Sequence, residues 1–332
     1  MATIEKTVRF YDTILIDEHD NRLSVEADFW TKLLSSFASW DLASRSGKIS
    51  DVDYLGLAVS PKRPALPHMQ VERIRDLTEQ LNRSNVSNGD VEPLDFDDPN
   101  DRVSEPTFIV PFGAYGRVAV MSPAVQGTRP ETLARWLTSV LDLVPKGYSL
   151  ELVPVVDPEI LEKIQNADGA VMLEVHVDAG AQVPASGGGA VGDAFRNAQH
   201  QALQDARLVF RWSLDRSGGN RSVRETLRTG AEWVVTNAFS SNAKVKLADE
   251  VAGGQLKRDD ERNLFEDRIT KNVTFHTTAG ERTSDEVILN AVGEAIREFM
   301  KGGTAIGLQI AGTSGSATIA FDGDVTGVTG GA

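Results

Sequence analysis

Two hydrophobic periods alternate along this 332-residue chain and constrain its fold more than any other feature. Segments such as Val8–Asp17 alternate apolar and polar residues, which is the period of a half-buried strand. Segments such as Glu26–Trp40 repeat apolar residues at spacings of three and four, which is typical of an amphipathic helix. Because the two kinds of segment are interspersed without regular βαβ units, we predict an α+β fold with mixed antiparallel sheets and packed helices.

The same patterns give an expected order of elements. Strands are predicted at 8–17, 53–60, 106–113, 116–124, 149–156, 170–180, 207–215, 242–250 and 271–278, with two weaker ones at 305–312 and 316–323. Helices are predicted at Glu26–Trp40, Met69–Arg83, from Pro130, from Pro158, at Asp193–Asp205, at 222–239, and from Ser284 to Lys301. A proline suits the first helical turn, where its missing N–H costs no hydrogen bond.

A change in composition at Ala181–Asp193 predicts a domain boundary. Its three consecutive glycines, Gly187, Gly188 and Gly189, would cost backbone entropy in a packed element and therefore suggest a hinge. We predict an N-terminal α+β domain at 1–182, a hinge at 183–192, a C-terminal α+β domain at 193–302 and a Gly/Thr/Ala-rich tail at 303–332. No GxGxxG or GK[ST] pattern accompanies the glycines, which disfavours a phosphate-binding loop.

The residue types exclude several kinds of chemistry. The chain has no cysteine, so disulfides, thiolate zinc sites and a cysteine nucleophile are excluded. Its five histidines form no HExxH pair, and no GxSxG elbow is present. No apolar run approaches the roughly 18 residues that span a bilayer, and the N-terminus has no signal-peptide core. We therefore expect a cytoplasmic protein that is not an enzyme and uses neither a metal nor a cofactor.

A metal-dependent nuclease remains an alternative. Asp249 and Glu250, followed by Lys257, faintly suggest the carboxylates and lysine that converge on a metal in such enzymes. Asp97, Asp98 and Asp101 lie together but lack the glycine and terminal glutamate of a calcium loop. Charged loops produce such matches by chance.

One basic segment stands out in an acidic chain. The formal net charge is −14, which argues against a simple nucleic-acid binder. Between residues 196 and 228, however, seven arginines face only three acidic residues, a local surplus of four positive charges. Arg221, Arg224 and Arg228 are spaced to line one face of a helix, and Arg216 lies in the turn before it.

Four further basic residues extend this segment. Lys244 and Lys246 alternate on the next predicted strand and therefore share a face, while Lys257 and Arg258 add a pair. Guanidinium groups match phosphate oxygens well, so these eight residues are the predicted contacts to a DNA backbone. The alternative is that the arginines pair with the surplus carboxylates or form a polar subunit interface. The absence of a recognisable helix-turn-helix or zinc finger disfavours a sequence-specific reader.

The order of these segments resembles the RexA family of phage-exclusion proteins, over roughly residues 8–300. The similarity lies in a pattern of successive segments: FYDT, LNRSNVS, EPTFIVPFGAYGRVAVMSPAV, ETLARWLTSVL, KGYSLELVPVVDPEILEKI, AVMLEVHVDA, AVGDAF, LVFRWSLD, SVRETLRTGAEWVV and KVKLADE. The order of the segments carries the resemblance, and no single motif does. The family is more basic overall and has no counterpart to the Gly-rich tail.

The resemblance implies a prophage-encoded sensor in abortive infection. Such a protein would be a homodimer that binds double-stranded DNA with little sequence preference, with a fold related to the ring-shaped RdgC dimer. A phage protein–DNA complex would trigger it, and its partner would be a RexB-like multi-spanning membrane channel. Carried over to this chain, the basic positions are Arg216, Arg221, Arg224 and Arg228, then Lys244 and Lys246. The glycine hinge would let two domains swivel around DNA.

Overall fold

A computed structural model gives the fold of most of the chain. It describes all residues except 1, 20, 61–65, 76–81, 85–90, 94–100, 114–115, 125–126, 156–157, 179–182, 185, 200–206, 216, 238–241, 252–254, 265–269, 278–282, 302–314, 320–327 and 332.

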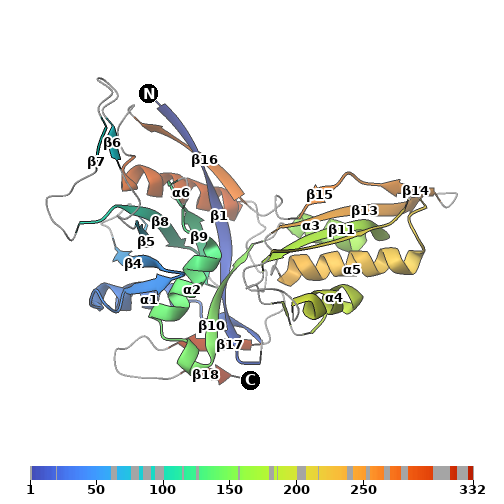
Figure 1. The fold of residues 1–332 in the computed structure, drawn as a ribbon, viewed down its shortest axis with the longest axis horizontal. Coiled ribbons are helices and arrows are strands. Elements are labelled where there is room, and N and C mark those ends of the chain that lie inside the picture. The colour runs from blue at the N-terminus through green and yellow to red at the C-terminus, as the bar shows by residue number, and fades with distance from the viewer. Residues whose placement is uncertain are drawn as a thin grey trace.

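The larger of two main sheets is built around one long strand, β1 (Ala2–Asp17). Its N-terminal half pairs with β16 (Thr270–Thr277), its middle with β9 (Arg117–Met121), and its C-terminal half with β10 (Tyr148–Pro154). All these pairings are antiparallel. They join segments more than 100 residues apart, so the first strand organises the whole fold (Figure 1).

The remaining strands extend this 11-stranded sheet on both sides. One side continues through β8, β5, β4 and β3, at Ser104–Pro111, His68–Ile74, Val52–Val59 and Ser46–Ile49. The other side continues through β2, β17 and β18, at Arg22–Val25, Gly315–Ile319 and Val328–Gly331. The weak strand predicted at 316–323 therefore exists in part as β17, which lies parallel to β2. A separate two-stranded ribbon consists of β6 (Asn82–Ser84) and β7 (Val91–Pro93).

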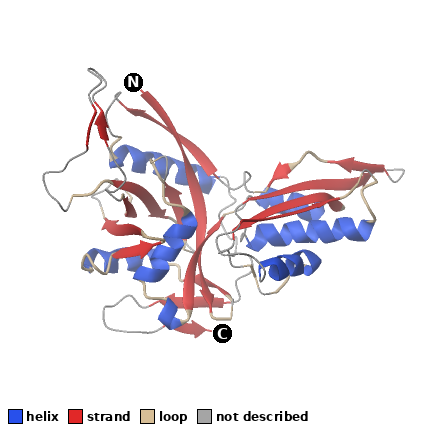
Figure 2. Cartoon of the chain, viewed as in Figure 1, coloured by secondary structure: helices blue, strands red, loops and turns tan. Residues whose placement is uncertain are grey.

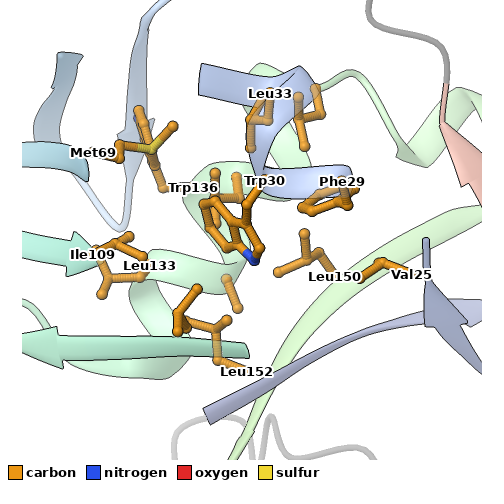
Figure 3. Packing of buried hydrophobic residues seen from close by; sticks show 14 of the residues in the cluster. Val25, Phe29, Trp30, Leu33, Met69, Ile109, Leu133, Trp136, Leu150 and Leu152 are labelled. Atoms are coloured by element: carbon orange, nitrogen blue, oxygen red, sulfur yellow. The ribbon is translucent and has the colours of Figure 1, made fainter. Parts of the chain in front are cut away.

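Helices cover both faces of the larger sheet. The alternation in β1 sends Tyr11 and Leu15 toward α1 (Phe29–Ser39) and α2 (Pro130–Val140), where Trp30 and Trp136 pack into one core (Figure 3). Phe10 points the other way, toward α6 (Asp285–Lys301), and stacks on Phe299 with ring centroids 4.4 Å apart. A 3₁₀ turn at Val144–Lys146 leads from α2 into β10.

The second sheet has five strands and its own core. The order is β12-β11-β13-β14, with β15 also paired to β13. The strands lie at Gly169–Asp178 (β11), Arg207–Ser213 (β12), Asn242–Val251 (β13), Gln255–Arg258 (β14) and Arg262–Asn263 (β15). Three helices accompany them, α3 (Pro158–Asn166), α4 (Gly189–Gln199) and α5 (Arg221–Asn237) (Figure 2). Figure 1 shows this unit beside the larger sheet.

The α+β class is confirmed, as are most predicted elements, but the helix expected at Met69–Arg83 is wrong. Residues His68–Ile74 form β5, which lies between β4 and β8 and pairs with both. The first four residues of β5 are all buried, including His68 and Gln70. Burial on both faces of a central strand removes the period-two pattern that would have identified it. Residues 76–81 of the predicted helix lie outside the described part of the chain.

The predicted domain boundary falls between two strands that pair with each other. β11 precedes the glycine run, β12 follows it, and the two run antiparallel from Met172↔Ser213 to Asp178↔Arg207. The segment 193–302 also supplies β16 and α6 to the larger sheet. The division between the two sheets thus follows the strand pairing and not the change in composition.

The glycine run itself is packed. Gly187 and Gly188 have φ values of 84° and 72°, and a Cβ added at either would lie within 3 Å of the Trp233 ring. The carbonyl of Gly188 accepts a hydrogen bond of 3.0 Å from the N–H of Gly192, and α4 begins at Gly189. Gly187 and Gly188 thus allow the backbone to pass close to the Trp233 ring. A swivelling of two domains about this segment stays a prediction.

Candidate nucleic-acid interface

The smaller sheet has two different faces. Alternate residues of β11, β12 and β13 point into a core that α3, α4 and α5 share, among them Val175 of β11, Phe210 of β12 and Val245 of β13. The Phe195 ring of α4 meets the Phe210 ring edge-on at 4.3 Å. Because side chains alternate along a strand, the residues between these core positions point to the opposite face.

We call this opposite side the open sheet face. It is defined by Glu174 and His176 of β11, Val209, Arg211 and Ser213 of β12, and Lys244 and Lys246 of β13. The Arg211 side chain is 59% exposed, and Val209 is 56% exposed. Lys244 and Lys246 share this face, as the sequence predicts.

Glu174 lies at the centre of the open sheet face. Arg211 is opposite it on one neighbouring strand and Lys244 on the other. Its carboxylate lies 3.0 Å from Nε2 of His176 and 3.4 Å from Nη1 of Arg211. The hydrogen bond with His176 lowers the pKa of Glu174, and the charges of Arg211 and Lys244 act in the same direction. The carboxylate therefore stays ionised and offsets part of the positive charge.

The positive charge of this face is small. Nζ of Lys244 lies 3.2 Å from a carboxylate oxygen of Glu261, whereas Lys246 has no carboxylate within ion-pair distance among the described residues. Three cations, Arg211, Lys244 and Lys246, thus stand against Glu174 and Glu261.

The structure places Arg224 inside the protein. This residue is 5% exposed, its Nη1 donates to the carbonyl oxygen of Gly219 at 2.8 Å, and its Nη2 donates to the Glu250 carboxylate. These contacts connect the glycine turn, the first turn of α5 and the end of β13. Arg224 therefore has no free guanidinium to offer a phosphate in this structure.

Arg228 is also held within the protein, and Arg221 is not. Nη1 of Arg228 lies 3.3 Å from a carboxylate oxygen of Glu232 and donates to the carbonyl of Ile164 at 3.4 Å. Arg221, the first residue of α5, is exposed and has no ion pair among the described residues. The three arginines predicted on one helix face thus do not form a continuous exposed stripe.

The last predicted contacts lie on the short strand β14. Lys257 and Arg258 are both exposed, and Nη2 of Arg258 donates to the carbonyl of Asp215 at 3.1 Å. Arg258 therefore lies over the turn that leads into Arg221. Arg216, in that turn, lies outside the described residues.

Arg211 and His176 belong to the open sheet face but were not among the predicted contacts. Arg211 counts toward the basic segment, but only the alternation in RLVFRWS distinguishes it from its neighbours that face the core. His176 becomes relevant only through its hydrogen bond to Glu174. The first signal is present in the sequence; the second depends on the fold.

The carboxylates considered for a nuclease have structural partners. Oδ1 of Asp249 accepts a hydrogen bond from the N–H of Asp168 at 3.2 Å, and Oδ2 of Asp168 accepts one from the N–H of Glu250 at 2.9 Å. Within the described residues, no group of three or more histidine, aspartate or glutamate side chains is placed to hold a metal ion. Asp97 and Asp98 lie outside that part of the chain.

No protein-family model matches the chain, and no curated protein is significantly similar to it. Among the described residues, no helix is long and apolar enough to cross a membrane.

Proposed function

We propose that this protein binds duplex DNA through its phosphates, without sequence preference, and does so with the open sheet face. The observation that carries the proposal is the presence of exposed Arg211 on β12 and of Lys246 on β13, across β11, on a sheet face whose opposite side holds all three helices of the unit. Arginine presents a planar fork of donors to phosphate oxygens, and lysine adds a point charge. Contacts that these side chains make to phosphates carry no sequence information.

The charge distribution accounts for the kind of binding we propose. A body with a net charge of −14 repels a polyanion everywhere except where cations gather. The open sheet face has a small surplus, so binding would be weak, and salt would reduce it in proportion to the few phosphate contacts. Arg258, which is exposed on β14 and opposite Ala248 of β13, would extend the contact on this face, whereas Arg221 begins α5 on the opposite side of the sheet.

In the cell, we propose that the protein acts as the sensor of a RexA-like exclusion system. The order of sequence segments supports this role, in which a phage protein–DNA complex is the trigger and a RexB-like membrane channel is the partner. An acidic surface suits a sensor that must stay off bulk DNA until a trigger appears.

A second candidate function is that of an interaction protein that does not bind nucleic acid. The internal ion pairs favour it, since Arg224, Arg228 and Lys244 each lie against a carboxylate of the same chain. Under this alternative, the basic residues stabilise the fold through ion pairs within the chain.

A gel-shift titration on an arbitrary duplex, without divalent metal and at rising salt, separates the two. We expect the wild-type protein to bind at low salt and the Arg211→Glu/Lys246→Glu variant to lose binding. The matched control is Arg297→Glu/Lys301→Glu, a double charge reversal at exposed residues of α6. Equal binding by both variants, or no shift at any salt concentration, would contradict the proposal and favour the second candidate.

A further inference from the structure

The strand β12 ends the smaller sheet with a free edge. Among the strands that the structure describes, it pairs only with β11. The N–H of Leu214 donates to Val171 of β11 at 2.9 Å, and these groups alternate in direction along an antiparallel ladder. The N–H and C=O groups of Val209, Arg211 and Ser213 therefore point away from β11. Such a row of unpaired groups is a template for another strand.

The side chains of β12 do not protect this edge. Val209 is one of the few large apolar residues that are more than half exposed. On the other face, Leu208, Phe210 and Trp212 are only partly buried, so the core is incomplete where the sheet stops. The opposite edge differs: β14 has four residues, and exposed Lys257 and Arg258 discourage pairing.

The charges on β12 favour one register for the pairing of two β12 strands. A two-fold antiparallel pair that continues both faces of the sheet overlaps over most of β12 when its axis lies at Phe210, the centre of the strand, or at the adjacent Val209 or Arg211. An axis at Val209 sets Arg207 opposite Arg211, and an axis at Arg211 sets that residue opposite itself. Both place like charges face to face, which is destabilising. An axis at Phe210 sets Arg211 opposite Val209 and Phe210 opposite its copy.

We propose that a second copy of this chain pairs along β12, antiparallel, about an axis at Phe210. The interface is isologous, as in most dimers. The two Phe210 residues form the pair without hydrogen bonds, in which side chains approach closest. Leu208 of each copy meets Trp212 of the other, which completes the core across the edge. The helices of both copies lie on one side, so the two open sheet faces join into one surface.

The absence of cysteine permits a direct test of the register. Val209 and Arg211 of opposite copies form a hydrogen-bonded pair, with Cα atoms about 5.5 Å apart, a separation that a disulfide spans. The Val209→Cys/Arg211→Cys variant should therefore give a covalent dimer after mild oxidation. Each single variant should stay monomeric on a non-reducing gel, because its cysteine faces no other. Cross-linking by either single variant would overturn the register.

The non-covalent dimer is tested by light scattering without DNA, so that a failure of DNA binding does not affect the result. We expect a wild-type dimer whose fraction rises with protein concentration. Val209→Pro removes an N–H that points away from β11, which an edge strand tolerates, and should give a folded monomer. Val209→Thr keeps that N–H and should remain a dimer. A wild-type monomer at every concentration, or a Val209→Pro dimer, would overturn the proposal.

Discussion

Arg224 and Glu250 form an ion pair that ties the first turn of α5 to the end of β13. The Arg224 side chain is 6% exposed and that of Glu250 is 41% exposed, so water reaches only one partner. The same guanidinium donates to the carbonyls of Gly218 and Gly219. This arginine therefore holds a turn in place, a structural role that the sequence alone does not reveal.

Replacement of Arg224 should affect stability. Arg224→Met keeps much of the side-chain volume but leaves Glu250 and the carbonyls of Gly218, which is buried, and Gly219 without their donor. Because Glu250 is partly solvated, we expect a loss of about 2 kcal/mol in the free energy of unfolding. Urea denaturation measures it. Arg221→Met, at an exposed position of the same helix, should change stability by less than about 0.5 kcal/mol. Equal losses in the two variants would contradict the assignment.

The two adjacent glycines Gly188 and Gly189 should differ in their tolerance of alanine. A Cβ at Gly188 would lie 2.6 Å from Trp233, whereas a Cβ at Gly189 would meet nothing within 4 Å. Both have positive φ and carry a backbone cost of about 1–2 kcal/mol. Overpacking adds about 1–3 kcal/mol at Gly188 alone. Thermal denaturation should therefore rank Gly188→Ala well below Gly189→Ala, while a freely swivelling hinge would show no such difference.

The buried His68 should make stability depend on pH. His68 is 2% exposed, and its Nδ1 lies 2.8 Å from the carbonyl oxygen of Leu66. Burial lowers the pKa of His68 below the ordinary value of 6.5, although the charge of Asp285 acts in the opposite direction. The unfolded chain then binds a proton that the folded chain resists. The stability contributed by neutral His68 is complete above pH 6.5 and is lost as the pH falls toward the lower folded pKa.

Comparison with His68→Phe isolates this effect. The wild-type protein should lose up to about 1.4 kcal/mol per pH unit more than the variant as the pH falls below 6.5. Urea midpoints at several pH values give the difference. Parallel losses in the two proteins would show that His68 does not titrate in this way.

Local patterns in the sequence predict much of the fold because their causes are local. The stripe of Leu227, Ala231, Val234 and Val235 buries one side of α5, and alternation places Lys244 and Lys246 on one face of β13. Pro130 begins α2, as its missing N–H suggests. In each case the side chains that face the core lie within one element.

The errors arise where the deciding contact is distant in sequence. Met69–Ile74 has apolar spacings that fit either a helix or a strand, and pairing with β4 and β8 decides for the strand. Likewise, the burial of Arg224 requires Glu250 from another element. The pairing of β16 with β1, which returns the chain to the first sheet, has no local signal.

The central claim, that the open sheet face contacts phosphates, is tested most directly by the salt dependence of duplex binding. Each phosphate contact contributes about 0.9 to the slope of log K against log salt concentration. Lys246→Gln should therefore lower the slope by about 1 and weaken binding to unrelated duplexes equally. An unchanged slope in Lys246→Gln, measured beside wild-type binding, would contradict the assignment of this face to DNA.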